Sequence, residues 1–298
     1  MDCAYDRGAG PAEVAMTDHS QAGGTAQVWV RNADFQRWQS LLTNRNKRQR
    51  LGEFLIHGVR PISLAVEFGW PLRRLLCPAG ERVSSWARRV IADAGVPTTA
   101  LAPELLWELG ERDSARPELI AVGAVPPDDL GRVTWGRGFL GVVLDRPVSP
   151  GNIGALTRSA DAFGASGVIV AGHAADVYDP KSVRASTGSL FRLPVVRCPS
   201  QQPVLDRVAA ENKRGPAVKI VGMDEHGALP VTACDLTVPV LVVIGNETTG
   251  MSAAWRACCD ETVRIPIGGA ASSLNAAAAG TVVLYEAGRQ RRFPSGGP

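Results

Sequence analysis

The chain has 298 residues, of which 45% are hydrophobic and 20% charged, and its formal net charge is +3. This length allows two ordinary domains, and the composition is that of a globular protein, which excludes a disordered or membrane-embedded chain. The small net charge excludes a uniformly basic nucleic-acid-binding protein, so an RNA-binding surface must come from local clusters of Arg and Lys.

The six cysteines are scattered and include no Cys-x-x-Cys pair. This usage predicts a reducing, cytoplasmic environment and no metal site. No apolar run follows a basic segment, and none approaches the roughly 20 residues that a bilayer span requires. We therefore expect neither a signal peptide nor a membrane partner.

The first half of the chain predicts a small α/β domain over residues 28–127. Residues 1–27 are rich in Gly, Ala, Asp and Ser, and we expect a disordered leader there. An amphipathic helix is predicted from Asp34, and it runs into the basic segment 44–50. Strands are predicted at 53–57, 72–77 and 119–125, and helices at 59–68 and 83–94. The residues at 128–138 predict a linker.

The second half predicts an α/β domain over residues 139–292 with a mostly parallel sheet, followed by a tail at 293–298. Residues 139–144 form a continuous apolar run, as in strands buried on both faces of a parallel sheet. Further strands are predicted at 167–170, 193–197, 218–223, 240–244 and 262–265. A helix ending near 163 and a long helix at 273–289 complete the pattern.

Three strand-to-helix junctions of this second domain have unusual compositions, and ligands of open parallel sheets bind at such junctions. The first contains Gly151, Asn152 and Gly154, with Arg158 further along the helix. Glycines allow close backbone approach, and a helix N-terminus offers N–H groups to an anion. The alternative is structural: Asn152 caps the helix and Arg158 is a solvated side chain.

A dinucleotide site is a second interpretation of the first junction. Gly151 and Gly154 match the last two glycines of Gly-x-Gly-x-x-Gly, and Asp176 is at about the distance expected of a ribose-binding acid. Ser149 replaces the first glycine, however, and Asp176 lies beyond the next predicted strand. A nicotinamide-dependent oxidoreductase therefore stays open as an alternative that explains this junction alone.

The second and third junctions carry further polar residues. Gly245, Asn246 and Glu247 follow the strand 240–244, and a carboxylate there lies at the carboxyl edge of the sheet. Ile265 is followed by Ser273, Leu274 and Asn275, and then by four alanines that predict very close packing, for example against another subunit. The structural alternatives are an ordinary turn for the second junction, and for the third an N-cap, such as Ser273, before a core helix.

Together the three junctions read Asn-x-Gly-x-x-x-Arg, Gly-Asn-Glu-x-x-Gly and Ile-Pro-x5-Ser-Ser-Leu-Asn, in that order. This set resembles the three motifs of the SpoU family of RNA ribose 2′-O-methyltransferases, which belong to the SPOUT class. The resemblance covers about 139–289. It departs from the family at Ala276 and Ala278, where valines are common.

The first domain resembles the L30e-like substrate-binding module that often precedes this domain. The stretch FQRWQSLLTNRNKRQRLGEFLIHGVRPI also resembles actinobacterial ribosomal RNA methyltransferases of the antibiotic-resistance, avilamycin-resistance type. The separate first domain favours ribosomal RNA, most of all 23S ribosomal RNA, over transfer RNA. A transfer-RNA enzyme and a catalytically silent RNA-binding protein of the same fold remain as alternatives.

The resemblance implies a deep trefoil knot and S-adenosyl-L-methionine bound within it. It also implies a homodimer with the site at the subunit interface. The cofactor-binding positions that it implies are Gly245, Asn246, Ile265, Leu274 and Gly188. The active-site positions that it implies are Asn152, Arg158, Glu247, Ser273 and Asn275.

The chemistry assigns these residues different roles. The sulfonium methyl is already electrophilic, so the difficult step is to generate and aim a ribose oxygen. An arginine, with a pKa above about 12, is a poor base, and we expect Arg158 to clamp phosphate and stabilise developing alkoxide charge. We expect Glu247 to fix Asn152 or Arg158.

The basic segment predicts the RNA contacts. Four cations follow the first helix, namely Arg45, Lys47, Arg48 and Arg50. Phosphate contacts from such a run would supply sequence-independent affinity. The alternative is a solvated loop without a ligand.

Overall fold

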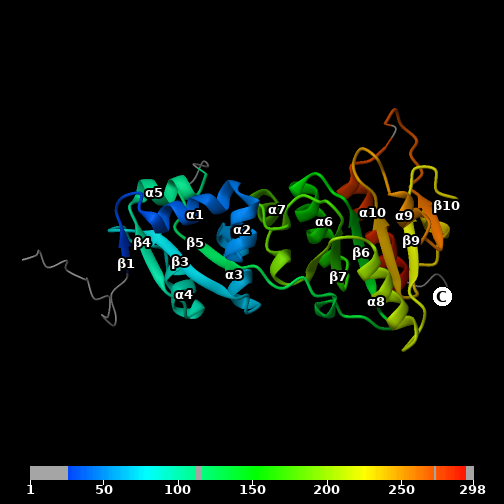
Figure 1. Cartoon of the computed structure of the whole chain (residues 1–298), viewed down its shortest axis with the longest axis horizontal. Helices are drawn as coiled ribbons and strands as arrows, with labels where there is room; N and C mark the ends of the chain where they lie inside the picture. The colour runs from blue at the N-terminus through cyan, green and yellow to red at the C-terminus, as the bar shows by residue number, and fades with distance from the viewer. Residues whose placement is uncertain (1–25, 112–115, 272, 293–298) are drawn as a thin grey trace, which may run out of the picture.

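The computed structural model describes residues 26–111, 116–271 and 273–292. They form two α/β domains that lie side by side along the long axis of the molecule (Figure 1). The predicted leader, apart from its last two residues, and the predicted tail lie outside the described residues.

The first domain is a five-stranded mixed sheet between two helical layers. The strand order is β1-β4-β3-β5-β2. Its strands are β1 (Ala26–Val28), β2 (Glu53–His57), β3 (Leu72–Pro78), β4 (Thr98–Leu101) and β5 (Ile120–Ala124). Its helices are α1 (Ala33–Thr43), α2 (Arg45–Leu51), α3 (Val59–Glu67), α4 (Ser85–Ala94) and α5 (Pro103–Leu109). Side chains of α1 and α5 pack on one face of the sheet, and those of α3 and α4 pack on the other.

The second domain is a seven-stranded sheet in the order β10-β12-β9-β11-β6-β7-β8, and every pair within it is parallel. Its strands are β6 (Leu140–Asp145), β7 (Gly167–Ala171), β8 (Val195–Cys198), β9 (Lys219–Met223), β10 (Leu229–Pro230), β11 (Val240–Ile244) and β12 (Glu261–Arg264). The central strands β6 and β11 are buried along their whole length, as the apolar runs predicted.

Helices cover both faces of this second sheet. They are α6 (Pro150–Ala162), α7 (Pro180–Ser186), α8 (Gln202–Asn212), α9 (Ala253–Arg256) and α10 (Ala276–Arg292). Three 3₁₀ turns lie at Leu130–Arg132, Ser189–Phe191 and Val231–Ala233. Helices α6 and α10 pack on one face, and α8 and α9 pack on the other. The predicted α/β class with a mostly parallel sheet is confirmed.

Several predicted boundaries and elements were wrong. The basic segment, for which a solvated loop was the alternative, forms helix α2, because the Asn44 side chain accepts a hydrogen bond from Lys47 N and caps a new helix. Helix α10 begins at Ala276 instead of 273, because Asn275, and not Ser273, is its cap: the Asn275 Oδ1 accepts from Ala277 N and Ala278 N. The helices α5, α7, α8 and α9 and the strands β1, β4 and β10 were not predicted.

The two domains share one continuous core. Phe54 of β2 contacts Tyr178 with ring centroids 4.8 Å apart, and Trp70 packs edge-on against Phe191 at 5.2 Å. Apolar residues of both domains belong to the same buried cluster. Because aromatic pairs of this kind bury large areas, the contact holds the domains in one relative orientation.

The segment predicted as a linker packs on the second domain. Asp128 forms an ion pair with Arg197 of β8, Val133 is 3% exposed, and the ring of Trp135 stacks on Phe139 at 4.2 Å.

Within the part of the chain that the structure describes, no helix combines the length and apolar character needed to cross a bilayer.

Candidate active site

The order of the second sheet brings the three predicted junctions together. Strands β12, β9, β11 and β6 are consecutive neighbours and parallel, so the loops after them leave the same edge. A cavity of about 480 Å³ lies at this edge, and it is lined by Gly245, Asn246, Glu247, Ile265, Ser273 and Leu274 among others. The structure therefore brings six of the predicted site residues into one cavity.

Glu247 is the centre of a hydrogen-bonded chain beside the cavity. Its Oε1 accepts from Asn152 Nδ2 at 2.9 Å and from Ser149 N at 3.2 Å, and its Oε2 accepts from Val148 N at 3.0 Å. Burial alone would raise the pKa of Glu247, but these hydrogen bonds outweigh it and hold the pKa below its ordinary value. Asn152 is one of the two partners expected of Glu247, Arg158 being the other, and the positioning role of Glu247 stays a prediction.

The chain of hydrogen bonds continues into the third motif. Because a carboxylate only accepts, Asn152 must present its Nδ2 to Glu247 and its Oδ1 to Asn275, whose Nδ2 donates at 3.0 Å. The Asn275 Oδ1 then faces the first N–H groups of α10. Every amide orientation is fixed by its neighbours, so residues 152, 247 and 275 are joined into one unit.

The expected capping role of Asn152 was wrong. Ser149 is the N-cap of α6, and its Oγ accepts from Asn152 N at 3.4 Å. Asn152 lies in the first turn, which leaves its side chain free for Glu247. Gly154, in the same turn, is required by packing, since a Cβ there would lie 2.1 Å from the carbonyl oxygen of Ser182.

The loop after β11 is shaped by Gly245 and Asn246. A Cβ on Gly245 would lie 2.2 Å from Met251 N, so only glycine fits. Asn246 Oδ1 accepts from Thr248 N, Thr248 Oγ1 and Thr249 N, and its Nδ2 donates to Arg146 O at 2.6 Å. The Asn246 side chain thus organises the loop, and its backbone faces the cavity.

Two predicted site residues lie elsewhere. Gly188 does not line the cavity; its missing Cβ would meet Leu64 Cδ1 at 2.5 Å, so its place is against the first domain. Its role as a cofactor contact stays a prediction. Arg158 is exposed on α6, outside the cavity lining, and its Nη1 lies 3.4 Å from Thr187 Oγ1.

The basic helix α2 faces partly inward, which corrects the prediction for Arg48. Arg48 is 2% exposed, and its Nε donates to Asp176 Oδ2 at 2.7 Å. Arg45 Nη1 donates to Ala174 O at 2.6 Å. Arg48 therefore cannot contact RNA phosphate from this position, whereas Lys47 is half-buried and Arg50 is exposed.

The ion pair between Arg48 and Asp176 argues against a dinucleotide-binding site at the first junction. Asp176, the expected ribose-binding acid, is 5% exposed and held by a cation of the other domain. It cannot accept from a ribose without weakening its buried ion pair with Arg48.

Sequence reasoning missed one side of the cavity. Met223 ends β9 and lines the cavity, together with the residues that follow it, Asp224, Glu225 and His226, and with Arg256 of α9. Burial would raise the pKa of Asp224, but hydrogen bonds from His226 N and Arg256 keep it below its ordinary value. Polar residues also follow β9 in the sequence, which could have indicated a site. The position of β9 between β11 and β12, however, follows only from the order of the strands in the sheet.

Comparison with known proteins agrees with this architecture. Residues 32–121 match the model of the SpoU L30e-like domain, and residues 140–285 match the SpoU rRNA Methylase family. The 23S rRNA (uridine(2479)-2′-O)-methyltransferase of Streptomyces viridochromogenes is 60% identical over 265 residues, which is 89% of this chain and 92% of that protein.

Solved structures are similar over both domains. The SpoU methyltransferase AviRb from Streptomyces viridochromogenes, in complex with AdoMet, superimposes with a TM-score of 0.85 at 59% identity, covering 88% of this chain and 99% of that one. An AdoMet-bound rRNA methyltransferase from Sinorhizobium meliloti gives a TM-score of 0.78 at 26% identity, covering 91% and 100%. On this evidence the chain belongs to the SpoU rRNA methylase family.

Proposed function

We propose that this protein transfers a methyl group from S-adenosyl-L-methionine to a ribose 2′-hydroxyl of 23S ribosomal RNA. The observation that carries the proposal is the hydrogen-bonded unit of Asn152, Glu247 and Asn275, which joins three motifs at one cavity. The relative that is 60% identical, and of which 92% is covered, is named for this reaction on a uridine. Protection of the ribosome from an antibiotic is the purpose that this relationship supports.

The cavity fits the cofactor. Its volume of about 480 Å³ lies in the usual range for small-molecule sites, roughly 300–1,000 Å³. Ile244, Ile265 and Leu274 supply apolar walls for an adenine, and Gly245 and Gly250 also line the cavity. The carboxylate of Glu225 supplies negative charge for a cationic ligand. When bound, the cofactor supplies an electrophilic methyl group.

The residues of the chain then have to position the ribose. Glu247 holds Asn152, and Asn152 and Asn275 present polar groups beside the cavity. Arg158 is exposed, so its guanidinium is free to hold a phosphate and to stabilise charge that develops on the 2′-oxygen. The implied knot stays a prediction.

A homodimer is part of the proposal. The outer face of α10 exposes Tyr285 (56%) and Val282 (36%), and Tyr285 packs on Phe163, the residue after α6. Leu274, at the edge of the cofactor cavity, is also 40% exposed. An apolar face beside the site is what a second copy would cover, and Arg158 of one copy would then serve a shared site.

One experiment tests the function against its alternatives. Calorimetry with S-adenosyl-L-methionine and with NAD distinguishes a methyltransferase from an oxidoreductase. Labelled methyl transfer to unmodified 23S ribosomal RNA, with transfer RNA as the matched control, followed by stalled primer extension, identifies the ribose. Label found only in transfer RNA contradicts the substrate, and cofactor binding without label in any RNA supports the silent protein instead.

A further inference from the structure

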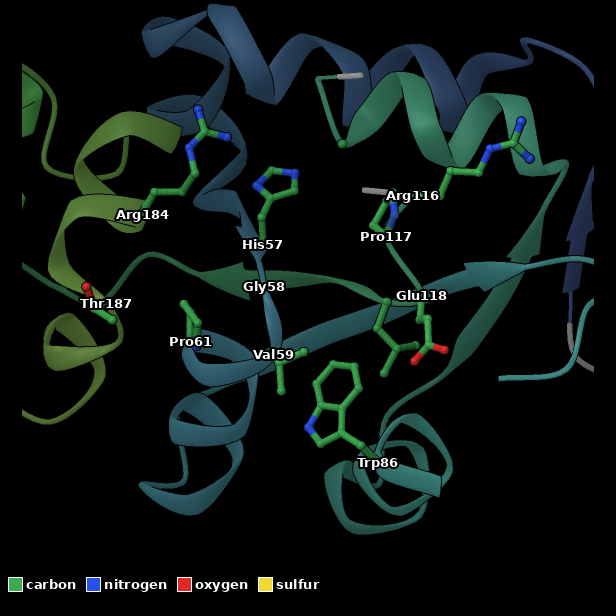
Figure 2. Close-up of a pocket in the computed structure, with 12 residues that line it drawn as sticks. His57, Gly58, Val59, Pro61, Trp86, Arg116, Pro117, Glu118, Arg184 and Thr187 are labelled. Atoms are coloured by element: carbon green, nitrogen blue, oxygen red, sulfur yellow. The ribbon is translucent and has the colours of Figure 1, made fainter. Parts of the chain in front are cut away.

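A second cavity, of about 510 Å³, lies between the domains and is separate from the cofactor cavity. The first domain contributes His57, Pro61, Trp86 and Glu118 to its lining, and α7 and the residue after it contribute Arg184 and Thr187. Figure 2 shows Arg184 and Thr187 on one side and Trp86 and Glu118 on the other. The cofactor proposal uses none of these side chains.

His57 lines this cavity and carries a buried, unpaired acceptor atom. Its Nε2 lies 2.9 Å from Leu109 O, and because a carbonyl oxygen only accepts, Nε2 must carry the proton. Nδ1 is then a bare lone pair, buried and without a partner in the described part of the chain. Burial lowers the pKa of His57, as does the nearby Arg184, so the ring stays neutral.

The remaining walls suit a nucleotide. The Trp86 Nε1 donates to Ser63 Oγ at 2.8 Å, which fixes the indole as a flat apolar surface beside Pro61. Unstacked RNA bases bind on aromatic rings of this kind. Glu118 and Arg116 also line this side, so it offers both a hydrogen-bond acceptor and donors to the edge of a base.

The opposite side suits a phosphate. Arg184 pairs with Glu111, yet its side chain is 38% exposed, and a guanidinium has five donors, so N–H groups remain for a ligand. Thr187 lines the same cavity, and its Oγ1 accepts from Arg158 Nη1 at 3.4 Å. The cavity is therefore in contact with the proposed catalytic arginine.

We propose that this interdomain cavity binds one unstacked nucleotide of the substrate RNA, next to the ribose that is methylated, with its base on Trp86 and its phosphate at Arg184. The inference rests on the proposed function and deepens it. It gives the first domain a direct part in selecting the target, in addition to any contact with distant phosphates.

The test measures binding of an unmodified 23S ribosomal RNA transcript as a function of salt. Trp86→Ala is expected to weaken binding roughly 5- to 150-fold, the range for loss of one stacked base, whereas Trp86→Phe retains most of it. Arg184→Gln is expected to lower the slope of log affinity against log salt by about one. Thermal unfolding is followed for each variant to establish that it is folded.

Glu111→Gln is the matched control. It breaks the same ion pair as Arg184→Gln but leaves the guanidinium in place, so its salt slope stays that of the unaltered protein. Equal slopes for the two variants, or unaltered affinity of folded Trp86→Ala, overturn the nucleotide site. Absence of methyl transfer by the unaltered protein overturns the proposed function as well, which distinguishes the two failures.

Discussion

The loop after β11 and helix α2 both carry charged residues, and they use them in opposite ways. Glu247 lies at the edge of a cavity, where its carboxylate orders Asn152 and, through it, Asn275. Arg48 points into the protein and joins the domains through Asp176. A charge at a strand end of a parallel sheet thus faces the ligand edge, whereas a charge on a short helix can instead hold two domains together.

The largest effect is expected at Arg158, the exposed arginine of α6, whose first turn is joined to the loop after β11 by Asn152 and Glu247. Arg158→Ala should retain S-adenosyl-L-methionine binding and lose methyl transfer by several orders of magnitude, because the phosphate clamp and the charge stabilisation disappear together. Arg158→Lys keeps the charge without the planar fork and should recover part of the rate. Single-turnover methylation measures both variants, and near-normal turnover of Arg158→Ala would falsify the role.

A substitution of Arg48 tests whether its ion pair with Asp176 stabilises the contact between the domains. Arg48→Met leaves Asp176 buried without its cation, and we expect a loss of about 3–5 kcal/mol in the free energy of unfolding. The double variant with Asp176→Asn should recover part of that loss. Denaturant unfolding measures it, and a loss below about 1 kcal/mol would show that the pair contributes little to domain docking.

These two regions also show what the sequence could and could not predict. Gly245, Glu247 and Asn275 were predictable because apolar runs identified the strands, and parallel strands end at one edge. The burial of Arg48 was not, because its partner Asp176 is 128 residues away and belongs to another domain. The residues after β9 were missed for a related reason, since strand order depends on long-range pairing.

Glu247 is expected to show the next largest effect. Glu247→Gln replaces an acceptor of three hydrogen bonds by a group that also donates, and kcat/KM should fall about 10- to 150-fold, as for loss of a hydrogen bond to a charged group. If the two residues act as one unit, Asn152→Ala should cause a similar loss and the double variant little more. Additive losses would contradict the coupling.

The neutral His57 predicts a pH dependence of stability. Burial lowers the pKa of His57 in the folded chain below 6.5; of the charged groups nearby, Arg184 also lowers it and Glu111 raises it. On acidification the unfolded chain therefore binds a proton that the folded chain does not. The free energy of unfolding should then decrease below about pH 6.5, by at most about 1.4 kcal/mol per pH unit. Unfolding of His57→Gln over the same range should lack this contribution, and an identical slope would exclude it.

Arg50 should give the smallest effect. It is exposed at the end of α2, so Arg50→Ala should leave stability within about 0.5 kcal/mol and reduce the salt slope of RNA binding by about one. Binding isotherms at several salt concentrations measure the slope. An unaltered slope would assign the whole of α2 to domain docking.

The packed seam between the domains has one more consequence. Phe54 on Tyr178, Trp70 on Phe191 and Arg48 on Asp176 act together as a rigid joint, so the span from the first domain to the methyl donor is a fixed length. Because the two domains cannot move relative to each other, the protein accepts only an RNA whose target ribose lies at this distance from the segment bound by the first domain. We therefore expect the RNA to do the bending, and an rRNA segment too stiff to fit that span to be passed over whatever its sequence.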